Sequence, residues 1–297
     1  MKWGDFLTKT QKLLRNRIFL YLLLTSLVLV TMFPLLIAVS TSLKSMNDIR
    51  SNPGRLIPEV IHFDNYKAAF SRGNWPQYFR NSFFITVVTT GISLITNSLA
   101  GYAFARLKFK GRNFLFGFSL FGMMVPMQVI MIPMFLRIKS LPLMGGNNIL
   151  GIGGSGLLNN IWGIIIPMLA GPFGVFLCRQ FFLGFPMALD EAAKMDGSSS
   201  LKTYLRIYLP LSKPVLATLG ILKATDAWNQ YLWPLIITNS ESGRTVQLAL
   251  AMFRGSNIVE WNLLMAATIV ICLPILILFL FLQKYYVQGV ITSGVKG

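Results

Sequence analysis

The polar side chains best placed for chemistry lie in an otherwise apolar run, Pro214–Thr238. Lys223 and Asp226 are opposite charges three residues apart. Residues at this spacing share a helix face, where opposite charges can pair. Charges inside a membrane are costly and by default mark a functional site. Two interpretations stay open, an ion pair that only neutralises itself and a charged pair that lines a polar path.

Aromatic and amide side chains follow at once, in the stretch WNQYLWPL. Aromatic rings stack on the C–H faces of a sugar, and amide groups bind its hydroxyls. An aromatic belt at the membrane edge explains Trp233, but Trp228 lies nearer to the middle of the run. Pro234 and the amides could also open the helix locally. The expected substrate path therefore comprises Lys223, Asp226, Trp228, Asn229 and Tyr231.

The composition indicates an integral membrane protein. Hydrophobic residues make up 54% of the chain and charged residues 12%, whereas a soluble domain carries about 25% charged residues. The net charge of +17 does not predict nucleic-acid binding, because the charges lie in the gaps between apolar runs. Cys178 and Cys272 fall in apolar runs, which predicts no disulfide. His62 is the only histidine, so we expect neither a histidine metal site nor a catalytic triad.

Six apolar runs are long enough to cross a membrane as helices. The expected fold is therefore an all-α integral membrane protein with six transmembrane helices. The first run is longer than the 7–15 apolar residues of a secretory signal, so we expect it to be retained. The six runs are Ile18–Leu43, Ser82–Ala105, Phe114–Leu136, Ile161–Leu177, Pro214–Thr238 and Trp261–Leu282.

The positive charges predict the orientation of these spans. With both termini in the cytoplasm, sixteen of the 27 Lys and Arg residues lie inside and ten outside. The short turn Arg106–Arg112 is the strongest single indication, because short loops dominate the positive-inside rule. The polar loop 183–213 then also faces the cytoplasm.

This polar loop predicts two short helices. Asp190 and Glu191 suit a helix N-terminus, and Gly197 followed by three serines suits a helix end. A second helical run, Leu201–Tyr208, places Leu201, Tyr204, Leu205 and Tyr208 on one face before Leu209-Pro210 ends it. Two such helices would form a knob that fits a groove on a cytoplasmic partner. An ordinary basic connector is the plainer alternative.

The spacing EAA-x3-G-x9-I-x-LP in this loop resembles the coupling loop of carbohydrate ABC importer permeases of the maltose and glycerol-phosphate type. The resemblance extends over essentially the whole chain and implies a type I permease fold. In that family the loop docks into a cleft on a separate ATPase. The carry-over assigns coupling to Glu191, Ala192, Ala193, Gly197, Ile207, Leu209 and Pro210.

The chain lacks the G-x-x-x-x-G-K-[ST] phosphate loop. We therefore expect no cofactor or enzymatic activity in this chain, with ATP and Mg bound by the partner ATPase. The family implies further partners: a second permease, which makes a heterodimer or a homodimer, two ATPase subunits and an extracytoplasmic solute-binding protein. It also implies the bacterial inner membrane. Residues 1–17 and 285–297 would be cytoplasmic tails around a permease domain, 18–284.

The pattern WN-x-x-x-WPL and the C-terminal QKYYVQGV resemble the carbohydrate branch of the family. In relatives of the maltose type this tail reaches the ATPase dimer. A sugar is the favoured substrate, and glycerol 3-phosphate or another polyol phosphate is the alternative. A dianion should attract unpaired basic residues, and Lys223 already has Asp226 beside it.

Gly151-x-Gly153-x-x-Gly156 formally matches a dinucleotide-binding fingerprint. That motif needs a preceding strand and a following helix, whereas this one lies in an outside loop, 144–160. We expect a flexible or tightly turned loop there. A secondary transporter would show an internal repeat, and an enzyme would show a nucleophile with a base. Neither pattern is convincing in this sequence.

Overall fold

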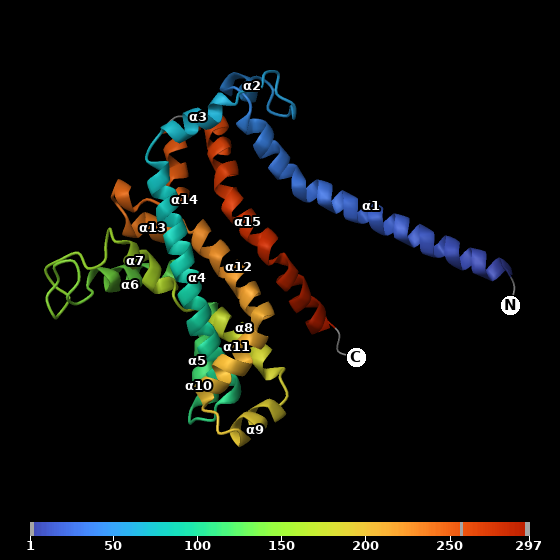
Figure 1. Cartoon of the computed structure of the whole chain (residues 1–297). Coiled ribbons are helices and arrows are strands. Elements are labelled where there is room, and N and C mark those ends of the chain that lie inside the picture. The colour runs from blue at the N-terminus through green and yellow to red at the C-terminus, as the bar shows by residue number, and fades with distance from the viewer. Residues whose placement is uncertain (1–2, 256–257, 295–297) are drawn as a thin grey trace. The chain divides into compact units, whose positions relative to one another are not determined.

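The chain folds almost entirely into helices (Figure 1). The computed structural model describes the backbone of residues 3–255 and 258–294, and the side chains of residues 17–255 and 258–284. Over those ranges the only paired extended residues are Arg254 and Val259, in an isolated bridge. Two compact units result, one of Met1–Arg72 with Phe253–Ile271 and the other of Gly73–Met252 with Cys272–Gly297.

The first unit holds α1 (Trp3–Ser42), α2 (Met46–Ser51), α3 (Asp64–Ser71) and the beginning of α15 (Trp261–Gly294). Asn65 joins three of these helices. Its buried amide nitrogen donates to the carbonyl oxygens of Ser42 and Lys44, both at 2.8 Å, and its amide oxygen accepts from Asn262 at 2.8 Å. The end of α1 is therefore fixed to α3 and to the first turn of α15.

The second unit is built around α4 (Trp75–Arg106), which packs along α8 (Pro172–Leu183) and α12 (Lys213–Asn229). Small residues let α4 and α8 approach closely, as is common between membrane helices. A Cβ at Gly101 would lie 2.6 Å from the Cβ of Cys178.

The remaining helices of this unit are α5 (Arg112–Met124), α6 (Met127–Lys139), α7 (Ile161–Ile165), η1 (Ile166–Met168), α9 (Ala188–Met195), α10 (Ser200–Thr203), η2 (Tyr204–Tyr208), α11 (Leu209–Leu211), α13 (Leu232–Ile237), η3 (Glu241–Gly243) and α14 (Val246–Ala249), with η4 (Leu250–Phe253) at its boundary.

The third predicted span is not one straight helix. Residues Arg112–Met124 and Met127–Lys139 form two helices bent by 104°. Pro126 disfavours the helical conformation in the residue before it, and Val125 is accordingly extended, with φ −87° and ψ 115°. An uninterrupted apolar run therefore hides a sharp turn of the chain.

The fifth predicted span is also interrupted, as the amides and Pro234 had suggested. Helix α12 ends at Asn229, and α13 begins at Leu232 after an extended Gln230. Pro234 cannot donate a hydrogen bond to the carbonyl of Gln230, and its ring would clash with that group in a continuous helix.

Four helices of the described chain are long and apolar enough to cross a membrane, or six if each bent pair counts as one span. The four are Arg17–Ser42, Trp75–Arg106, Ile161–Leu183 and Trp261–Lys284. The first and last runs continue as helix beyond their predicted limits, from Trp3 and to Gly294.

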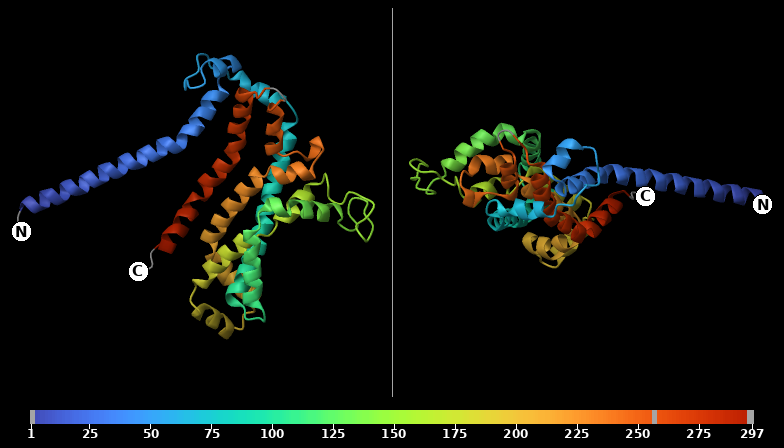
Figure 2. Two further views of the ribbon diagram at one scale, coloured as in Figure 1. Left: turned by 180° about the vertical axis from the view of Figure 1, so that it is seen from behind. Right: turned by 90° about the horizontal axis from the view of Figure 1, so that it is seen from above.

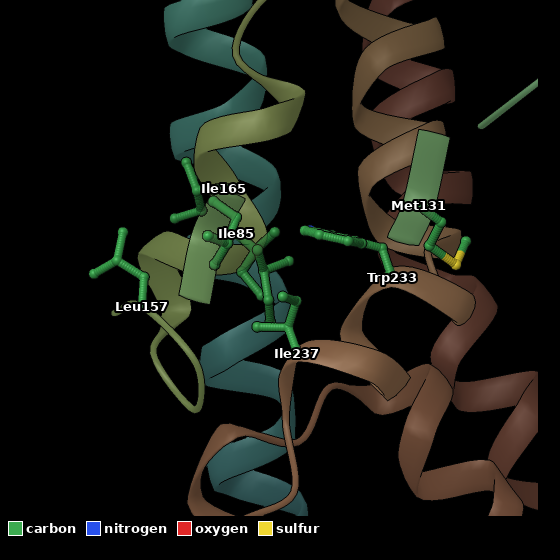
Figure 3. Packing of buried hydrophobic residues seen from close by; sticks show 8 residues of the cluster. Ile85, Met131, Leu157, Ile165, Trp233 and Ile237 are labelled. Carbon is green, nitrogen blue, oxygen red and sulfur yellow. The ribbon is translucent and has the colours of Figure 1, made fainter. Parts of the chain in front are cut away.

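A buried apolar cluster fills one end of the second unit (Figure 3). Ile85 of α4, Ile165 of α7 and Ile237 of α13 pack there with Leu157 and Trp233. Trp233 is fully buried and donates its indole N–H to the carbonyl oxygen of Gly163 at 3.2 Å. It is thus a core residue, which differs from the lipid-facing belt position expected for it.

Candidate functional site

The polar loop between α8 and α12 does form two short helices. The first, α9, has Asp190 and Glu191 in its first turn. It ends in a Schellman motif, in which Ser198 N–H donates to the Ala193 carbonyl and Gly197 N–H to that of Lys194, at 2.9 and 3.0 Å. Gly197 has a φ of +67°, the left-handed conformation that this motif requires. The predicted helix end at Gly197 is confirmed.

The second helical segment comprises α10, the π-helical turn η2 and α11. Ser199 caps its start by accepting a hydrogen bond from the Lys202 N–H at 3.4 Å. The segment is amphipathic, but its four predicted face residues divide between two sides. Tyr204 and Tyr208 are buried, while Leu201 and Leu205 are 60% and 49% exposed. Only the two leucines face outward, because the tyrosine rings pack on the end of α4.

Aromatic rings fix the buried side of this segment. Tyr102 of α4 lies 5.3 Å from the ring of Tyr204 and 5.0 Å from that of Tyr208, between centroids. The Tyr204 hydroxyl lies 2.6 Å from that of Ser98, also on α4. Phe182 at the end of α8 completes the cluster. The loop is therefore packed on the ends of two predicted spans.

A buried polar contact ties the loop to α4, and we name its residues, Arg106, Asp190 and Tyr208, the loop anchor. The Arg106 guanidinium lies 3.4 Å from the Asp190 carboxylate, with the two side chains 3% and 15% exposed. The Tyr208 hydroxyl donates to the other carboxylate oxygen at 2.9 Å. Arg106 also donates to the Phe185 carbonyl and stands over the Tyr208 ring, 5.3 Å from its centroid.

The environment keeps Tyr208 a neutral hydrogen-bond donor. Burial raises the pKa of its hydroxyl, and the hydrogen bond to Asp190 raises that pKa further. The phenol therefore holds its proton at physiological pH. Tyr208 can therefore donate its hydroxyl hydrogen to Asp190 at that pH.

The residues of the EAA motif take different positions around this anchor. Glu191 and Ala192 are exposed, and Ala193 is buried. Ile207 and Leu209 are half-buried, while Gly197 and Pro210 are exposed. Met195, at 88% exposed, adds to the outward apolar surface with Leu201 and Leu205.

A groove of about 560 Å³ lies beside the break between α12 and α13. Asp226, Asn229 and Tyr231 line it, three of the five residues that the sequence analysis assigns to a substrate path. Asp226 accepts a hydrogen bond from Gln230 at 3.2 Å, and Gln247 donates to Asn229 at 3.1 Å. The other lining residues are Met127, Gln128, Met131, Leu222, Thr225, Gln230 and Leu232.

Lys223 and Trp228 lie off this groove. A Cβ at Gly171 would be 3.1 Å from the Lys223 ammonium, which therefore points toward the start of α8. Of the ion pairs found among the described side chains, none joins Lys223 to Asp226. Trp228 is only 4% exposed and packs near Phe79, with ring centroids 6.3 Å apart.

No three His, Cys, Asp or Glu side chains within the described ranges lie together in a way that could hold a metal ion. The polar groups of the groove, hydroxyl, amide and carboxylate, suit hydrogen bonding to a hydroxylated ligand.

Sequence reasoning missed the loop anchor. The sequence places Arg106 in the short turn that indicates orientation, and it places Asp190 and Tyr208 in the two loop helices without bringing the three residues together. The usable signal was local, since Asp190 and Arg106 both stand at helix ends beside apolar residues. Their contact joins residues 84 positions apart, which no spacing rule reveals.

Three comparisons place the chain among known proteins. The family model described as binding-protein-dependent transport system inner membrane component matches residues 97–292. The chain is 35% identical over 282 residues to the probable ABC transporter permease protein YurM of Bacillus subtilis, covering 94% of this chain and 87% of that protein. It is 34% identical over 284 residues to the arabinooligosaccharides transport system permease protein AraQ of the same species, covering 95% and 96%.

The fold is similar to a chain in the crystal structure of a bacterial ABC transporter involved in the import of the acidic polysaccharide alginate. The TM-score is 0.75 at 26% identity, with 96% of this chain and 99% of the other covered. The predicted all-α type I permease fold is confirmed. This chain belongs to the family of inner membrane components of binding-protein-dependent transport systems.

Proposed function

We propose that this multi-pass membrane protein forms part of the translocation path of a sugar importer and couples that path to a separate ATPase. The coupling element is the loop of α9, α10, η2 and α11. The loop anchor carries this proposal, because it joins the loop to the end of the long helix α4. A displacement of the loop would then move α4 with it.

The two sides of the loop take different parts in this coupling. The outward side carries Glu191, Met195 and Leu205, a charged and apolar surface suited to a groove on a partner. The inward side carries the anchor, where loss of one partner would leave a buried charge unpaired. Breaking such a pair typically costs about 3–5 kcal/mol. The outward side would bind the ATPase, and the inward side would transmit its motion.

The groove at the break of α12 supplies the substrate path. Asn229, Gln230 and Tyr231 offer amide and hydroxyl groups to sugar hydroxyls, beside apolar Met and Leu side chains. Asp226 is the single charged group among the described lining residues, and it is negative. A carboxylate disfavours an anionic substrate. An uncharged saccharide therefore suits this groove better than a polyol phosphate or an acidic sugar.

Names of relatives agree with a saccharide. AraQ is named for arabinooligosaccharides, and the solved neighbour imports alginate. The family description implies delivery by a solute-binding protein. The segment after α13 is a candidate contact for that protein, and Asn81 of α4 holds it by donating to the carbonyls of Ser242 and Arg244, at 2.7 and 2.8 Å. A second permease and two ATPase subunits complete the proposed assembly, with ATP and Mg bound by the ATPases.

One pair of variants tests whether the outward side of the loop binds the ATPase and the inward side transmits its motion. Leu205→Asp, on the outward side, should abolish copurification of the ATPase. Tyr208→Phe, on the inward side, keeps the ring but removes the hydrogen bond to Asp190, which is worth about 1.5–3 kcal/mol for a charged acceptor. This variant should retain the ATPase but transport less sugar per ATP in proteoliposomes, by about tenfold at the lower figure.

Ile57→Asp is the matched control, because Ile57 is 76% exposed in a loop far along the chain from the coupling segment. It should leave both copurification and the sugar-to-ATP ratio unchanged. Normal uptake and normal ATPase binding in Leu205→Asp would overturn the coupling role of the loop.

A further inference from the structure

The loop between α6 and α7 carries an apolar tip that the transport mechanism does not use. Ile149 and Leu150 are 78% and 80% exposed, and Leu143 and Ile152 are similarly open. The sequence from Ser140 to Cys178 contains no charged residue at all. The other long connections, 44–80 and 239–260, each carry several charges. A contiguous exposed apolar patch of this kind marks an interaction surface.

The tip is held in a defined shape. The buried Asn147 side chain donates to the carbonyls of Lys139 and Leu141, at 2.8 and 2.9 Å, and accepts from the Gly154 N–H at 2.8 Å. The Asn148 side chain accepts from the N–H groups of Leu150 and Ile152, at 2.9 and 3.0 Å. The loop is thus tightly turned, and the fingerprint glycines 151, 153 and 156 serve its left-handed turns. Its exposed apolar side chains are presented by a fixed scaffold.

The base of the loop packs against the half of α4 that is farther from the coupling loop. Leu157 lies in one buried cluster with Ile85, in the first half of α4. The N–H of Asn159 donates to the carbonyl of Ile237 at 2.9 Å, near the end of the span Pro214–Thr238. Within this unit the coupling loop packs at the opposite end of α4, around Tyr102 and Ala105. Both views of the ribbon show the loop extending sideways from α6 and α7 (Figures 1 and 2).

Side chains typical of a membrane surface surround this base. Trp162, 42% exposed, stands edge-on to Phe84 at 6.1 Å between centroids. Arg137 and Lys139 are exposed in the last turn of α6, directly before the loop. Tryptophan is enriched at membrane interfaces, and long basic side chains reach lipid headgroups there.

We propose that residues 143–152 form a membrane-surface anchor, inserted among phospholipids of the leaflet opposite the coupling loop. Leu143, Ile149, Leu150 and Ile152 enter the boundary of the acyl chains, and Arg137 and Lys139 bind lipid phosphates above them. A fixed apolar tip in the headgroup region braces the bent helix α6. Helix α6 is then held by the bundle through Met131 and Ile138 and by lipid through the loop that follows it.

The absence of charge decides between lipid and a protein partner as the occupant. A soluble binding protein would meet a tip that carries no charged side chain, with the basic Arg137 and Lys139 before it in the chain, whereas specific interfaces usually have a polar rim. Hydrocarbon selects for this composition, because a charged residue there costs about 2.5–3.5 kcal/mol. The position of the loop base, away from the coupling loop along α4, also fits lipid as the occupant.

Photocrosslinking in native membranes tests this proposal on the assembled transporter. Benzoylphenylalanine replaces Leu150, with Phe118 of α5, 68% exposed within an apolar run, as the positive control and Asn52 of the connection 44–80 as an exposed polar control. Irradiation should add the mass of one phospholipid to the peptide containing position 150 and to that containing position 118. The peptide containing position 52 should gain none.

An adduct of position 150 with the second permease or with the solute-binding protein would overturn the proposal. A missing adduct at position 150, with the adduct at position 118 present, would overturn it equally. Uptake of sugar by all three labelled transporters shows that the assembly is intact, and neither result bears on coupling by the opposite loop.

Discussion

At the scale of single residues, the groove and the loop anchor show how charge is used in this membrane protein. Asp226 lies on the wall of the groove and is bound by Gln230. Asp190 is bound by Arg106 and Tyr208. The first carboxylate is open to a ligand, and the second is closed off by protein. An aspartate at the groove can therefore contact a ligand, whereas the aspartate of the loop anchor only holds the loop to α4.

Asp226 should act without Lys223. We predict that Asp226→Asn lowers uptake of a neutral sugar about tenfold, since one hydrogen bond to a charged acceptor contributes about 1.5 kcal/mol. The double variant Asp226→Asn with Lys223→Met should show the same loss, because Lys223 points toward α8. Initial uptake rates of the two single variants and the double variant measure this. Recovery in the double variant would instead identify the ion pair that the i, i+3 spacing suggests.

The residue types of the candidate site could be predicted, but their directions could not. Asn229 and Tyr231 do line a groove, as aromatic and amide chemistry suggests. Trp228 and Trp233 are both buried. The rotation of α12 and the break after Asn229 decide which side chains reach the groove. These depend on packing against α4 and α7, which leaves no periodic trace in the sequence.

At the scale of elements, local signals predicted helix ends well and bends poorly. Gly197 follows the last residues of α9, because a glycine followed by serines is a local signal sufficient to end a helix. The 104° bend at Val125-Pro126 lies in an apolar run without a charged residue, so hydropathy alone reports one span. Proline was the available signal there. Burial of Tyr204 and Tyr208 likewise required the end of α4 to be known.

The Schellman motif at Gly197 should be sensitive to backbone conformation and not to side-chain volume. A Cβ there would meet nothing within 4 Å, but the φ of +67° strains most residues. We predict that Gly197→Val weakens the motif by about 1–2 kcal/mol, and that Gly197→Asn, which tolerates this conformation, weakens it less. Hydrogen exchange at the Ser198 amide should accelerate about tenfold in the valine variant.

Sugar transported per ATP hydrolysed should follow the same order, falling from glycine to asparagine to valine. Equal exchange rates in the asparagine and valine variants would show that the left-handed turn is not what holds the two loop helices at their angle.

At the scale of the whole molecule, the distribution of basic residues predicts which end of the bundle faces the cytoplasm. The turn after α4 and the coupling loop together carry nine Lys and Arg residues, counting Arg179. The α6–α7 loop carries none between Ser140 and Asn160. From the positive-inside rule we expect the loop anchor on the cytoplasmic side and the apolar tip on the other side. Coupling to a cytoplasmic ATPase and anchoring in the outer leaflet both require this orientation.

Cysteine labelling tests the orientation directly. In a Cys272→Ala background, Cys178 is fully buried and should not react. An impermeant maleimide applied to intact cells should label Ser242→Cys, and it should label Ser198→Cys and Lys110→Cys only after permeabilisation. Labelling of Ser198→Cys from outside would place the coupling loop beyond the reach of any cytoplasmic ATPase. That single result would exclude the proposed coupling, while the proposal that the groove binds uncharged sugars would be unaffected, because it rests on the lining of the groove.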